Sequence, residues 1–418
     1  MRVAVIGNLG GYGHLTAAYL RRLGVDAHVF IGIHESGQAD PTWDGIDVVD
    51  PAAAWVHRWG APGFADPYPP GASGLIARLR RRSGLLPLLR SLRRFDVIVA
   101  YAGGPSGLYR WTGRPYLLNA NGSDLRELAV RETPAGRRMR GAFRRAAVVL
   151  LLNLDMVRIA RRLHLPHAHF MPFAIDTERF RPAPGARPAG GELRVFHPSH
   201  LDWTYRGGDR TSTKGNDRFL RALAQAGRRG VRARVDLLER GPDVAATRRL
   251  VRELELEDRV TFLPELRRPD LIRAMQEADL VVDQFDVGAF GTTALEAMAC
   301  GAPLLTYIDP EAAALCYPDP PPILNARTQE EIACRLQACV DPQTRREMGQ
   351  AGRGWVEKYH RWDRVMDRLI HHAETAAGPG LRRARHAAPP DGVTKEAREG
   401  AEPLGAAPDR GKTRMGAR

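Results

Sequence analysis

The stretch 286–301, Asp-Val-Gly-Ala-Phe-Gly-Thr-Thr-Ala-Leu-Glu-Ala-Met-Ala-Cys-Gly, has the pattern of a phosphate-binding turn. It follows an apolar run typical of a buried strand and continues into residues typical of a helix. The first amides of a helix have no partner within it, so the N–H groups of Gly291, Thr292 and Thr293 could bind an anion. Glu296 follows about one turn later, where a carboxylate can accept hydrogen bonds from ribose hydroxyls. A capped helix without a ligand is the alternative interpretation.

Lys214 is a second candidate for binding an anion. Only four of the 62 basic residues are lysines, and this one stands in Thr213-Lys214-Gly215, just before a helix expected from about Asp217. Its ammonium group would add positive charge beside a helix start that already favours anions. An exposed surface lysine is the alternative.

A glycine-rich turn, Gly7–His14, follows the first predicted strand. Its spacing, G-x-x-G-G-x-G, differs from the G-x-G-x-x-G of dinucleotide-binding folds, and no acidic residue ends the next strand. His14 could contact a ligand or merely pack or cap a helix. Asp124 could contact a ligand too, or form a capping box with Glu127.

These segments lie in a chain that alternates strands with helices, which indicates parallel sheets covered by helices on both faces. The expected fold is therefore α/β, with two Rossmann-like, doubly wound domains facing a cleft. Strands are predicted at 3–6, 25–31, 95–101, 115–119, 147–152, 193–197, 235–238, 260–263, 280–283 and 303–307, and helices at 12–23, from about 217, at 245–254, 269–277 and 292–299.

The composition divides the chain into parts. A first domain is expected over 1–180 and a second over 193–354, joined by a linker, 181–192, that is rich in Pro and Gly. From 378 to 418 the sequence has no periodicity, which predicts a disordered tail.

Three segments together resemble the retaining GT-B glycosyltransferases of family 4 (group 1 type), which use nucleotide-sugar donors. Phe290-Gly291 and the run 296–301 are similar to the family's Glu-Gly-Phe-Gly and Glu-Ala-Met-Ala-x-Gly signature. Lys214-Gly215 resembles its Lys-Gly turn, and 173–182 resembles the segment that ends its first domain. The resemblance spans 1–372 and implies that the last helices, 355–377, cross back to the first domain.

The resemblance also implies roles for individual residues. Lys214 would neutralise the departing diphosphate of the donor. Donor-binding residues would be Gly288, Phe290, Gly291, Thr292, Thr293 and Glu296. Residues on the acceptor side would be Gly11, Tyr12, His14, Asn121 and Asp124.

The sequence departs from the family pattern at three places. Gly288 stands where the family has its first Glu, and Asp286 is the candidate substitute; a branch of the family has Gly there after an Asp-Gln pair such as Asp283-Gln284. His200 stands where an Arg is expected, with Arg206 or Arg210 available as the missing cation. Asn121 replaces a His.

The implied function is transfer of a sugar from a nucleoside-diphosphate donor to a hydroxyl acceptor (a saccharide, a lipid-linked acceptor or a small molecule), with retention of anomeric configuration. The catalytic residues would be Lys214, His200 and Asp286. No cofactor is expected. No metal is expected either, since no Asp-x-Asp motif stands in a suitable place. Two alternatives remain open: a nucleotide-sugar epimerase or other non-transferring enzyme of this fold, and a non-enzymatic, membrane-docked scaffold.

The composition restricts location and partners. The net charge of +14 comes almost entirely from arginine spread along the chain, which indicates a compositional bias, so no nucleic-acid partner is expected. With no signal peptide and no run of about 18 apolar residues, a cytoplasmic protein is expected. The segment 75–94 mixes Leu with Arg. It would either lie on the inner face of an anionic membrane or pack its leucines on the sheet.

Overall fold

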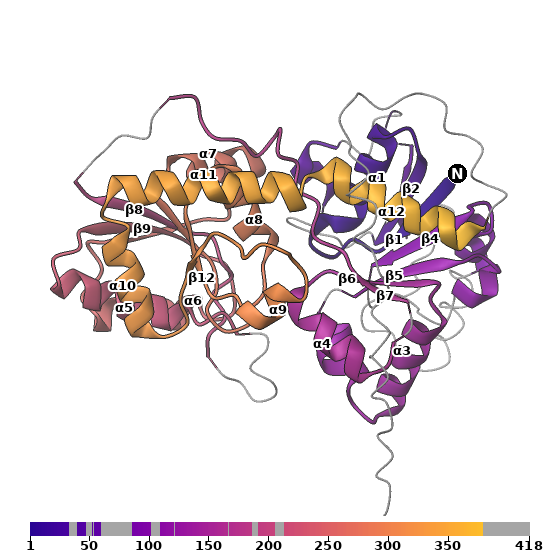
Figure 1. Cartoon of the computed structure of the whole chain (residues 1–418), viewed down its shortest axis with the longest axis horizontal. Coiled ribbons are helices and arrows are strands. Elements are labelled where there is room, and N and C mark those ends of the chain that lie inside the picture. The colour runs from indigo at the N-terminus through magenta and orange to yellow at the C-terminus, as the bar shows by residue number, and fades with distance from the viewer. Residues whose placement is uncertain are drawn as a thin grey trace, which may run out of the picture.

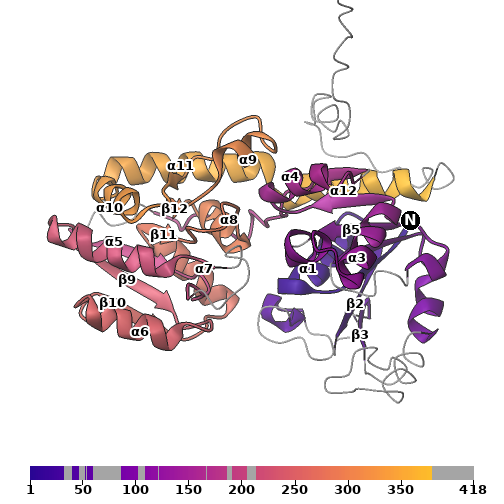
Figure 2. The ribbon, with the colours of Figure 1, turned by 90° about the horizontal axis from the view of Figure 1, so that it is seen from below.

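The computed structural model describes residues 1–32, 40–46, 52, 54–59, 86–101, 109–120, 122–165, 167–185, 191–204 and 213–378. Several predictions concern residues outside this part: Asn121, Arg206, Arg210, 75–85 of the Leu/Arg segment, 186–190 of the linker and 379–418 of the tail. The described residues form two lobes side by side, each built on a central sheet with helices against it (Figures 1 and 2).

Both sheets are parallel, and in each the order in which successive strands are added reverses once. Within the described residues the first lobe has seven strands in the order β3-β2-β1-β4-β5-β6-β7, and the second has six in the order β10-β9-β8-β11-β12-β13. The order therefore reverses beside β1 in one lobe and beside β8 in the other. Ligands of doubly wound sheets bind at the carboxyl ends of strands at such reversals.

The strands are mostly continuous apolar runs, as expected for sheets buried on both faces. Their bounds are β1 Arg2–Ile6, β2 Asp26–Gly32, β3 Val56–Trp59, β4 Val97–Tyr101, β5 Tyr116–Ala120, β6 Val148–Leu151, β7 Ala168–Phe170, β8 Leu193–His197, β9 Ala233–Leu238, β10 Val260–Leu263, β11 Leu280–Val282, β12 Leu304–Thr306 and β13 Leu324–Asn325.

The helices cover both faces of each sheet. They are α1 Tyr12–Arg22, α3 Pro134–Arg145, α4 Leu154–Arg162, α5 Asn216–Arg228, α6 Val244–Glu253, α7 Arg268–Glu277, α8 Thr292–Ala299, α9 Pro310–Ala314, α10 Gln329–Ala338, α11 Pro342–Tyr359 and α12 Trp362–Ala377. Shorter turns are the 3₁₀ helices η1 Leu9–Gly11, η3 Pro41–Asp44 and η5 Tyr109–Thr112, and the π-helix η6 Asp124–Ala129.

Every predicted strand and helix is present, with bounds that agree to about two residues. The strands that the sequence did not predict are β3, β7 and β13, which lie at the edges of the two sheets. Edge strands are short and partly exposed, so they lack the apolar run that marks a central strand. The predicted division at 354/355 falls inside α11, a single continuous helix.

The C-terminal helices tie the two lobes together, as predicted. Helix α11 lies on the second lobe and α12 continues onto the first (Figure 1). At the junction Ile175 pairs with Arg361: the Ile175 amide donates to the carbonyl of His360 at 2.8 Å, and the Trp362 amide donates to that of Ile175 at 3.0 Å. The Trp362 ring stacks on Tyr19 of α1, with 5.2 Å between centroids.

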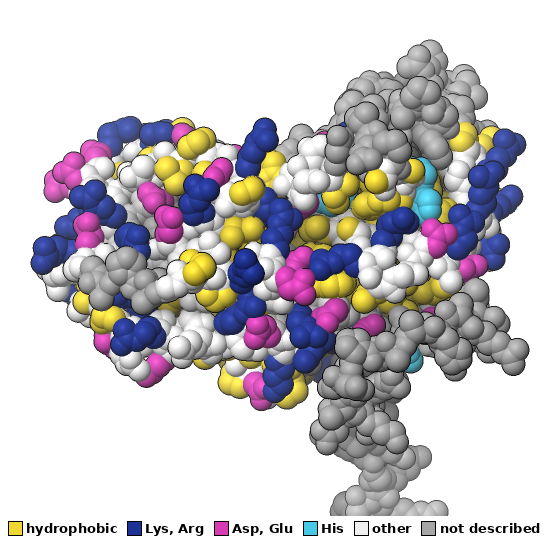
Figure 3. All heavy atoms as spheres, turned by 90° about the horizontal axis from the view of Figure 1, so that it is seen from above, with side chains coloured by type: hydrophobic (Ala, Val, Ile, Leu, Met, Phe, Trp, Pro, Cys, Tyr) yellow, Lys and Arg dark blue, Asp and Glu magenta, His cyan; other side chains and the backbone are white. Residues whose placement is uncertain are grey.

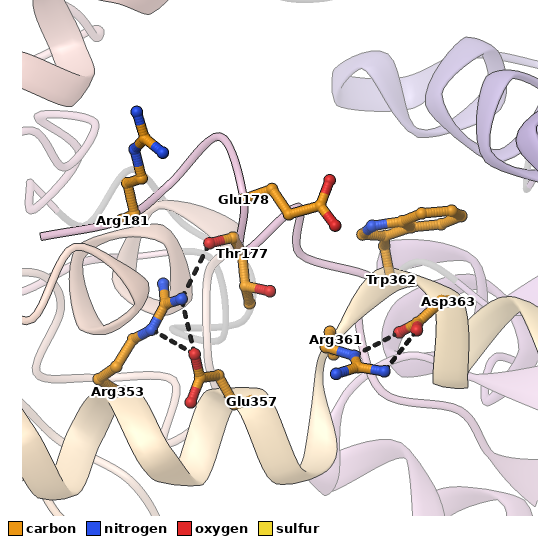
Figure 4. A pocket seen from close by; sticks show the side chains of 8 residues that line it. All are labelled: Thr177, Glu178, Arg181, Arg353, Glu357, Arg361, Trp362 and Asp363. Atoms are coloured by element: carbon orange, nitrogen blue, oxygen red, sulfur yellow. Dashed lines mark hydrogen bonds and ion pairs between the residues drawn. The ribbon is translucent and has the colours of Figure 1, made fainter. Parts of the chain in front are cut away.

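A pocket of about 400 Å³ lies at this junction, and two of the three arginines that line it, Arg353 and Arg361, have protein partners (Figure 4). Arg353 donates to the carbonyls of Phe180 and Ala299 at 2.6 Å and to that of Thr177 at 3.0 Å. Arg361 pairs with Asp363. The contacts of Arg353 fasten the end of the first lobe to α11.

Two fully buried histidines make the stability of the fold depend on pH. In His360, Nδ1–H donates to the carbonyl of Phe173 and Nε2 accepts from the hydroxyl of Tyr317. In His197, Nδ1–H donates to the carbonyl of Val282 and Nε2 accepts from Asn216. Burial lowers the pKa of each imidazole to about 4. A second proton would remove the acceptor nitrogen of each ring, and in His197 the new N–H would face the side-chain amide N–H of Asn216.

The expected result is a loss of stability as the pH falls from about 6.5 to 4. The unfolded chain binds a proton on each histidine near pH 6.5, whereas the folded chain does not until about pH 4. Each buried histidine then removes about 1.4 kcal/mol of unfolding free energy per pH unit. Urea unfolding of the wild type and of His360→Gln at pH 7 and pH 5 measures this. If the unfolding free energy fell by the same amount between the two pH values in both proteins, the prediction would be contradicted.

Candidate functional site

Lys214 lies at the carboxyl end of the second sheet, at the reversal between β8 and β11. Its amide donates to the carbonyl of Asp202 at 2.6 Å, and its own carbonyl accepts from the Phe285 amide at 2.8 Å. Its ammonium group contacts Gln284 Oε1 at 3.3 Å. The backbone therefore pins Lys214 against the residues that follow both central strands, and it is not the free surface lysine of the alternative interpretation.

Burial and charge act against one another at this lysine. Desolvation lowers the pKa of Lys214, while the negative charge of Asp283 raises it. Desolvation likewise raises the pKa of Asp283, and Lys214 lowers it. One carboxylate oxygen of Asp283, Oδ2, is buried and has no hydrogen-bond partner among the described residues. Among the described residues the Lys214 ammonium has one hydrogen-bond partner, Gln284, so its other N–H groups can donate to an anion at the end of the sheet.

The start of α8 lies at the same place. Gln284, which accepts from Lys214, also donates through Nε2 to the carbonyl of Ala289. Gly291 caps the helix without a side-chain hydrogen bond. Among the described residues no acceptor meets the amides of Thr292 and Thr293. The structure therefore brings together the two anion-binding features expected from the sequence.

Gly288 has a backbone conformation and close neighbours that disfavour the Glu that the family pattern expects. Its φ is +69°, and a Cβ built on it would lie 3.0 Å from Cε1 of Tyr307 and 3.3 Å from Cβ of Asp309. The Asp309 amide donates to the Gly288 carbonyl at 3.0 Å. The positive φ favours glycine, and a Cβ at this position would require Tyr307 and Asp309 to move by a few tenths of an ångström.

Two other predicted site residues have structural partners. The Asp286 carboxylate accepts from the Thr213 hydroxyl at 2.7 Å and pairs with Arg218 of α5. These contacts with residues on either side of Lys214 stabilise the turn that contains it. The Phe290 ring packs in the core against Trp355 and His360, at 5.6 and 6.5 Å between centroids, so it anchors the loop from behind.

His200 is half-buried beside positive neighbours. Desolvation lowers the pKa of its imidazole, and Arg240 and Lys214 lower it further. The ring is therefore largely uncharged near pH 7 and can offer a hydrogen bond rather than the charge of the expected Arg.

Glu296 belongs to a buried ionic chain that connects the two lobes. It accepts from Nη1 of Arg268 at 2.9 Å, and Nε of Arg268 donates to Asp44 of η3 in the first lobe at 3.0 Å. Asp44 also contacts Nε2 of His14 at 2.9 Å and Arg179 at 3.0 Å. Desolvation raises the pKa of Glu296, opposed by Arg268, whereas the pKa of Asp44 is lowered by its hydrogen bond to His14 and by Arg268 in spite of its own burial.

The first lobe contributes its glycine-rich turn to this contact. Gly11 caps α1 with φ +85°. Tyr12 stacks on Phe173 at 5.1 Å. Burial raises the pKa of the Tyr12 hydroxyl, and the Thr292 side chain at the start of α8 has a smaller, opposite effect on it. His14 is fully buried and contacts Asn8 as well as Asp44, so it positions this chain rather than lining open space.

Asp124 has a local role in the structure. Its Oδ1 accepts from the amides of Gly122 and Leu125 at 2.9 Å. Helix η6 begins at Asp124 itself, with Ser123 at the cap and no side-chain cap hydrogen bond, so the predicted capping box with Glu127 is wrong. Sequence reasoning missed Arg268 and Asp44 as parts of the site, and it named Gln284 only in the Asp-Gln pair of a family branch. The one available signal was Arg268 itself, since a cation in the first turn of a helix opposes the usual charge preference.

Comparisons with known proteins agree with this geometry. The family model "Glycosyl transferase 4-like domain" matches residues 10–174, and "Glycosyl transferases group 1" matches residues 208–319. Between them the two models cover more than half of the chain.

Curated relatives match over part of their length. The chain is 28% identical over 218 residues to a GDP-mannose-dependent alpha-(1-6)-phosphatidylinositol monomannoside mannosyltransferase of Mycobacterium tuberculosis, covering 48% of this chain and 54% of the relative. It is 28% identical over 213 residues to a D-inositol 3-phosphate glycosyltransferase of Saccharomonospora viridis, covering 47% of each. The chain thus spans about half the length of these relatives.

Solved structures match nearly the whole chain in fold. A sucrose-phosphate synthase from Thermosynechococcus elongatus superposes with a TM-score of 0.61 at 18% identity, covering 89% of this chain and 98% of that one. A glycosyltransferase from Rickettsia africae superposes with a TM-score of 0.62 at 12% identity, covering 90% and 98%. The predicted GT-B fold is confirmed, and the chain belongs to the group 1 (family 4) glycosyltransferases.

Proposed function

We propose that this protein transfers a sugar from a nucleoside-diphosphate donor to a hydroxyl acceptor with retention of anomeric configuration. The observation that carries the proposal is the meeting of the Lys214 ammonium and the unpartnered amides of Thr292 and Thr293 around Asp283 and Gln284. Retention follows from the resemblance of the two signature segments to retaining enzymes.

The chemistry asked of this site is electrostatic. The bond between the sugar's anomeric carbon and the diphosphate breaks, the acceptor oxygen bonds to that carbon, and the acceptor loses its hydroxyl proton. Negative charge therefore grows on the diphosphate as it leaves. Lys214 and the helix-start amides stabilise that charge, and a single donor of this kind contributes about 3–4 kcal/mol.

The relatives suggest which donor to try first. The mannosyltransferases of Mycobacterium tuberculosis and Corynebacterium glutamicum are both named as dependent on GDP-mannose. We therefore propose GDP-mannose as donor. The specific acceptor is left to experiment, with inositol phosphates and phosphatidylinositol mannosides as the first set because these relatives carry such names.

Incubation with GDP-mannose and each acceptor tests the function. The expected result is acceptor-dependent release of GDP and a glycoside whose anomeric configuration, read by proton NMR, equals that of the donor. An isomerised sugar formed without acceptor would favour the epimerase alternative. Failure to bind guanosine, uridine or thymidine diphosphate in calorimetry would favour the scaffold alternative.

Glu296→Ala should weaken donor binding. If the carboxylate accepts hydrogen bonds from ribose hydroxyls, its loss removes charge-assisted bonds and raises the Kd for GDP about tenfold or more. Isothermal titration with GDP measures this. An unchanged Kd would refute the ribose contact while leaving the diphosphate site intact.

Contact with a membrane is a further part of the proposal. In the described end of the Leu/Arg segment, Leu88 and Leu92 are buried on the sheet, as in the packing alternative. Leu86 and Trp111, however, are each 57% exposed, and Arg93 donates to the Trp111 carbonyl at 2.9 Å. None of the described helices is long and apolar enough to cross a bilayer, so we propose peripheral contact at this edge.

Sedimentation with vesicles tests the membrane contact. We expect binding to vesicles containing phosphatidylinositol and weaker binding in 0.5 M salt, because screening removes the attraction of arginine for anionic lipid. Trp111→Ala should reduce the bound fraction several-fold, by loss of an interfacial aromatic ring. On the face seen in Figure 3 acidic side chains stand among the basic ones. Equal binding to neutral and anionic vesicles would count against the proposal, because it would show no attraction to anionic lipid.

A further inference from the structure

Arg268 occupies an unusual place for an arginine. It is the first residue of α7 and is only 5% exposed. A helix start favours acidic side chains, and burial of a guanidinium is costly unless it is paired. A residue that opposes both preferences is retained for a specific interaction. In this structure that interaction is a bridge between two carboxylates.

The bridge has a fixed geometry. Nη1 donates to Glu296 Oε1 at 2.9 Å, while Nε donates to Asp44 Oδ1 at 3.0 Å. The guanidinium is planar, so its two bonds fix the orientation of Arg268 between the two carboxylates, and one of them holds Oε1 of Glu296 in place. Among the described residues Glu296 has no other hydrogen bond, which leaves its second oxygen, Oε2, to accept from a ligand.

The location of Glu296 relative to the anion site suggests what that ligand group is. Glu296 lies one turn into α8, whose first amides we assign to the diphosphate. A ribose follows directly on the diphosphate of any nucleotide, so the next polar group along the ligand is a ribose hydroxyl. Helices α7 and α8 lie on the side of the second lobe that faces α1 of the first (Figure 2).

We propose that Arg268 is a positioning residue of the donor site: it orients the Glu296 carboxylate toward the ribose hydroxyls and ties it, through Asp44, to the first lobe. The inference rests on the proposed function, because it takes Glu296 as the ribose contact. It adds that this contact depends on a residue outside the family signature and on a carboxylate from the opposite lobe.

The test compares two ligands on one set of variants. GDP and 2′,3′-dideoxy-GDP are titrated by calorimetry into the wild type, Glu296→Ala, Arg268→Gln and the control Arg273→Gln. Arg273 lies on the same helix with its side chain 67% exposed. The ratio of the two Kd values reports only the ribose hydroxyls, so a general loss of structure, which weakens both ligands equally, does not change it.

The wild type and the Arg273→Gln control should prefer GDP about tenfold or more. Arg268→Gln should reduce that preference to within about threefold, as Glu296→Ala does. Arg268→Lys is the second variant: a lysine cannot bond both carboxylates in one plane, so its preference should be intermediate.

Each failure has its own meaning. If the wild type binds neither nucleotide, the proposed function fails. If the wild type prefers GDP and a folded Arg268→Gln or Arg268→Lys protein keeps the full preference, the positioning role is overturned while the proposed function stands. Circular dichroism establishes which variants are folded, and the lysine variant decides the question should the glutamine variant unfold.

Discussion

Replacement of Lys214 by alanine lowers the turnover number about a hundredfold or more. The ammonium group lies at the end of the second sheet beside Gln284 and Asp283, where the diphosphate of the donor is expected. Its removal takes one preorganised charge away from a leaving group whose negative charge increases in the transition state. The measurement is the rate of GDP release at saturating donor and acceptor.

Lys358→Ala is the matched control for this experiment. Lys358 lies on α11, is more than half exposed and pairs with Asp319. A surface ion pair of this kind contributes little to stability, so its loss should leave turnover within about twofold. A folded Lys214→Ala protein with a near-normal rate would remove Lys214 from the mechanism. Lys214→Met keeps the apolar part of the side chain and serves if the alanine variant does not fold.

Among the described glycines of the first lobe, Gly13 is the one whose replacement by alanine should destabilise the fold most. A Cβ at residue 13 would lie 1.9 Å from the carbonyl oxygen of Gly7 and 2.9 Å from its carbon. Both are backbone atoms, so the turn between β1 and α1 would have to move as a unit. We expect a loss of about 3 kcal/mol or more of unfolding free energy, seen as a lower midpoint in thermal unfolding followed by circular dichroism.

Gly354→Ala provides the opposite expectation. Gly354 lies inside α11, and no atom stands within 4 Å of the place where its Cβ would be. Alanine is favoured over glycine in a helix interior by about 0.5–1 kcal/mol, so this variant should unfold at a higher temperature. A Gly13→Ala protein as stable as Gly354→Ala would show that the close approach of residues 7 and 13 does not constrain the turn.

The elements of the fold could be predicted because most of them are buried on two sides. Central strands such as β4 and β6 are continuous apolar runs, and α8 begins where Gly and Thr precede an apolar stretch. The edge strands β3, β7 and β13 were not predicted because partial exposure allows polar residues in them, whereas the edge strand β10 was predicted. The pairing of lobes through α12 came from the family resemblance and not from any periodicity.

The site was predictable only where its residues are close in sequence. Thr292, Thr293 and Glu296 form one motif, and Lys214 stands out because lysine is rare in this chain. The bridge between Arg268 and Asp44 joins residues 224 positions apart, and no local pattern indicates that the two residues meet. Packing likewise decided the roles of Phe290 and Asp286, since only the fold shows that one faces the core and the other Arg218.

The way in which α12 closes the first lobe has a consequence for biosynthesis. Val365, Met366, Leu369 and Ile370 share one buried cluster with Val3 and Val5 of β1. A ribosome makes the opening strand first and this helix only after the entire second lobe has emerged. Until α12 is made, the nascent first lobe therefore has an exposed apolar face, which is a natural substrate for chaperones. Any premature stop before residue 362 would leave that face permanently exposed.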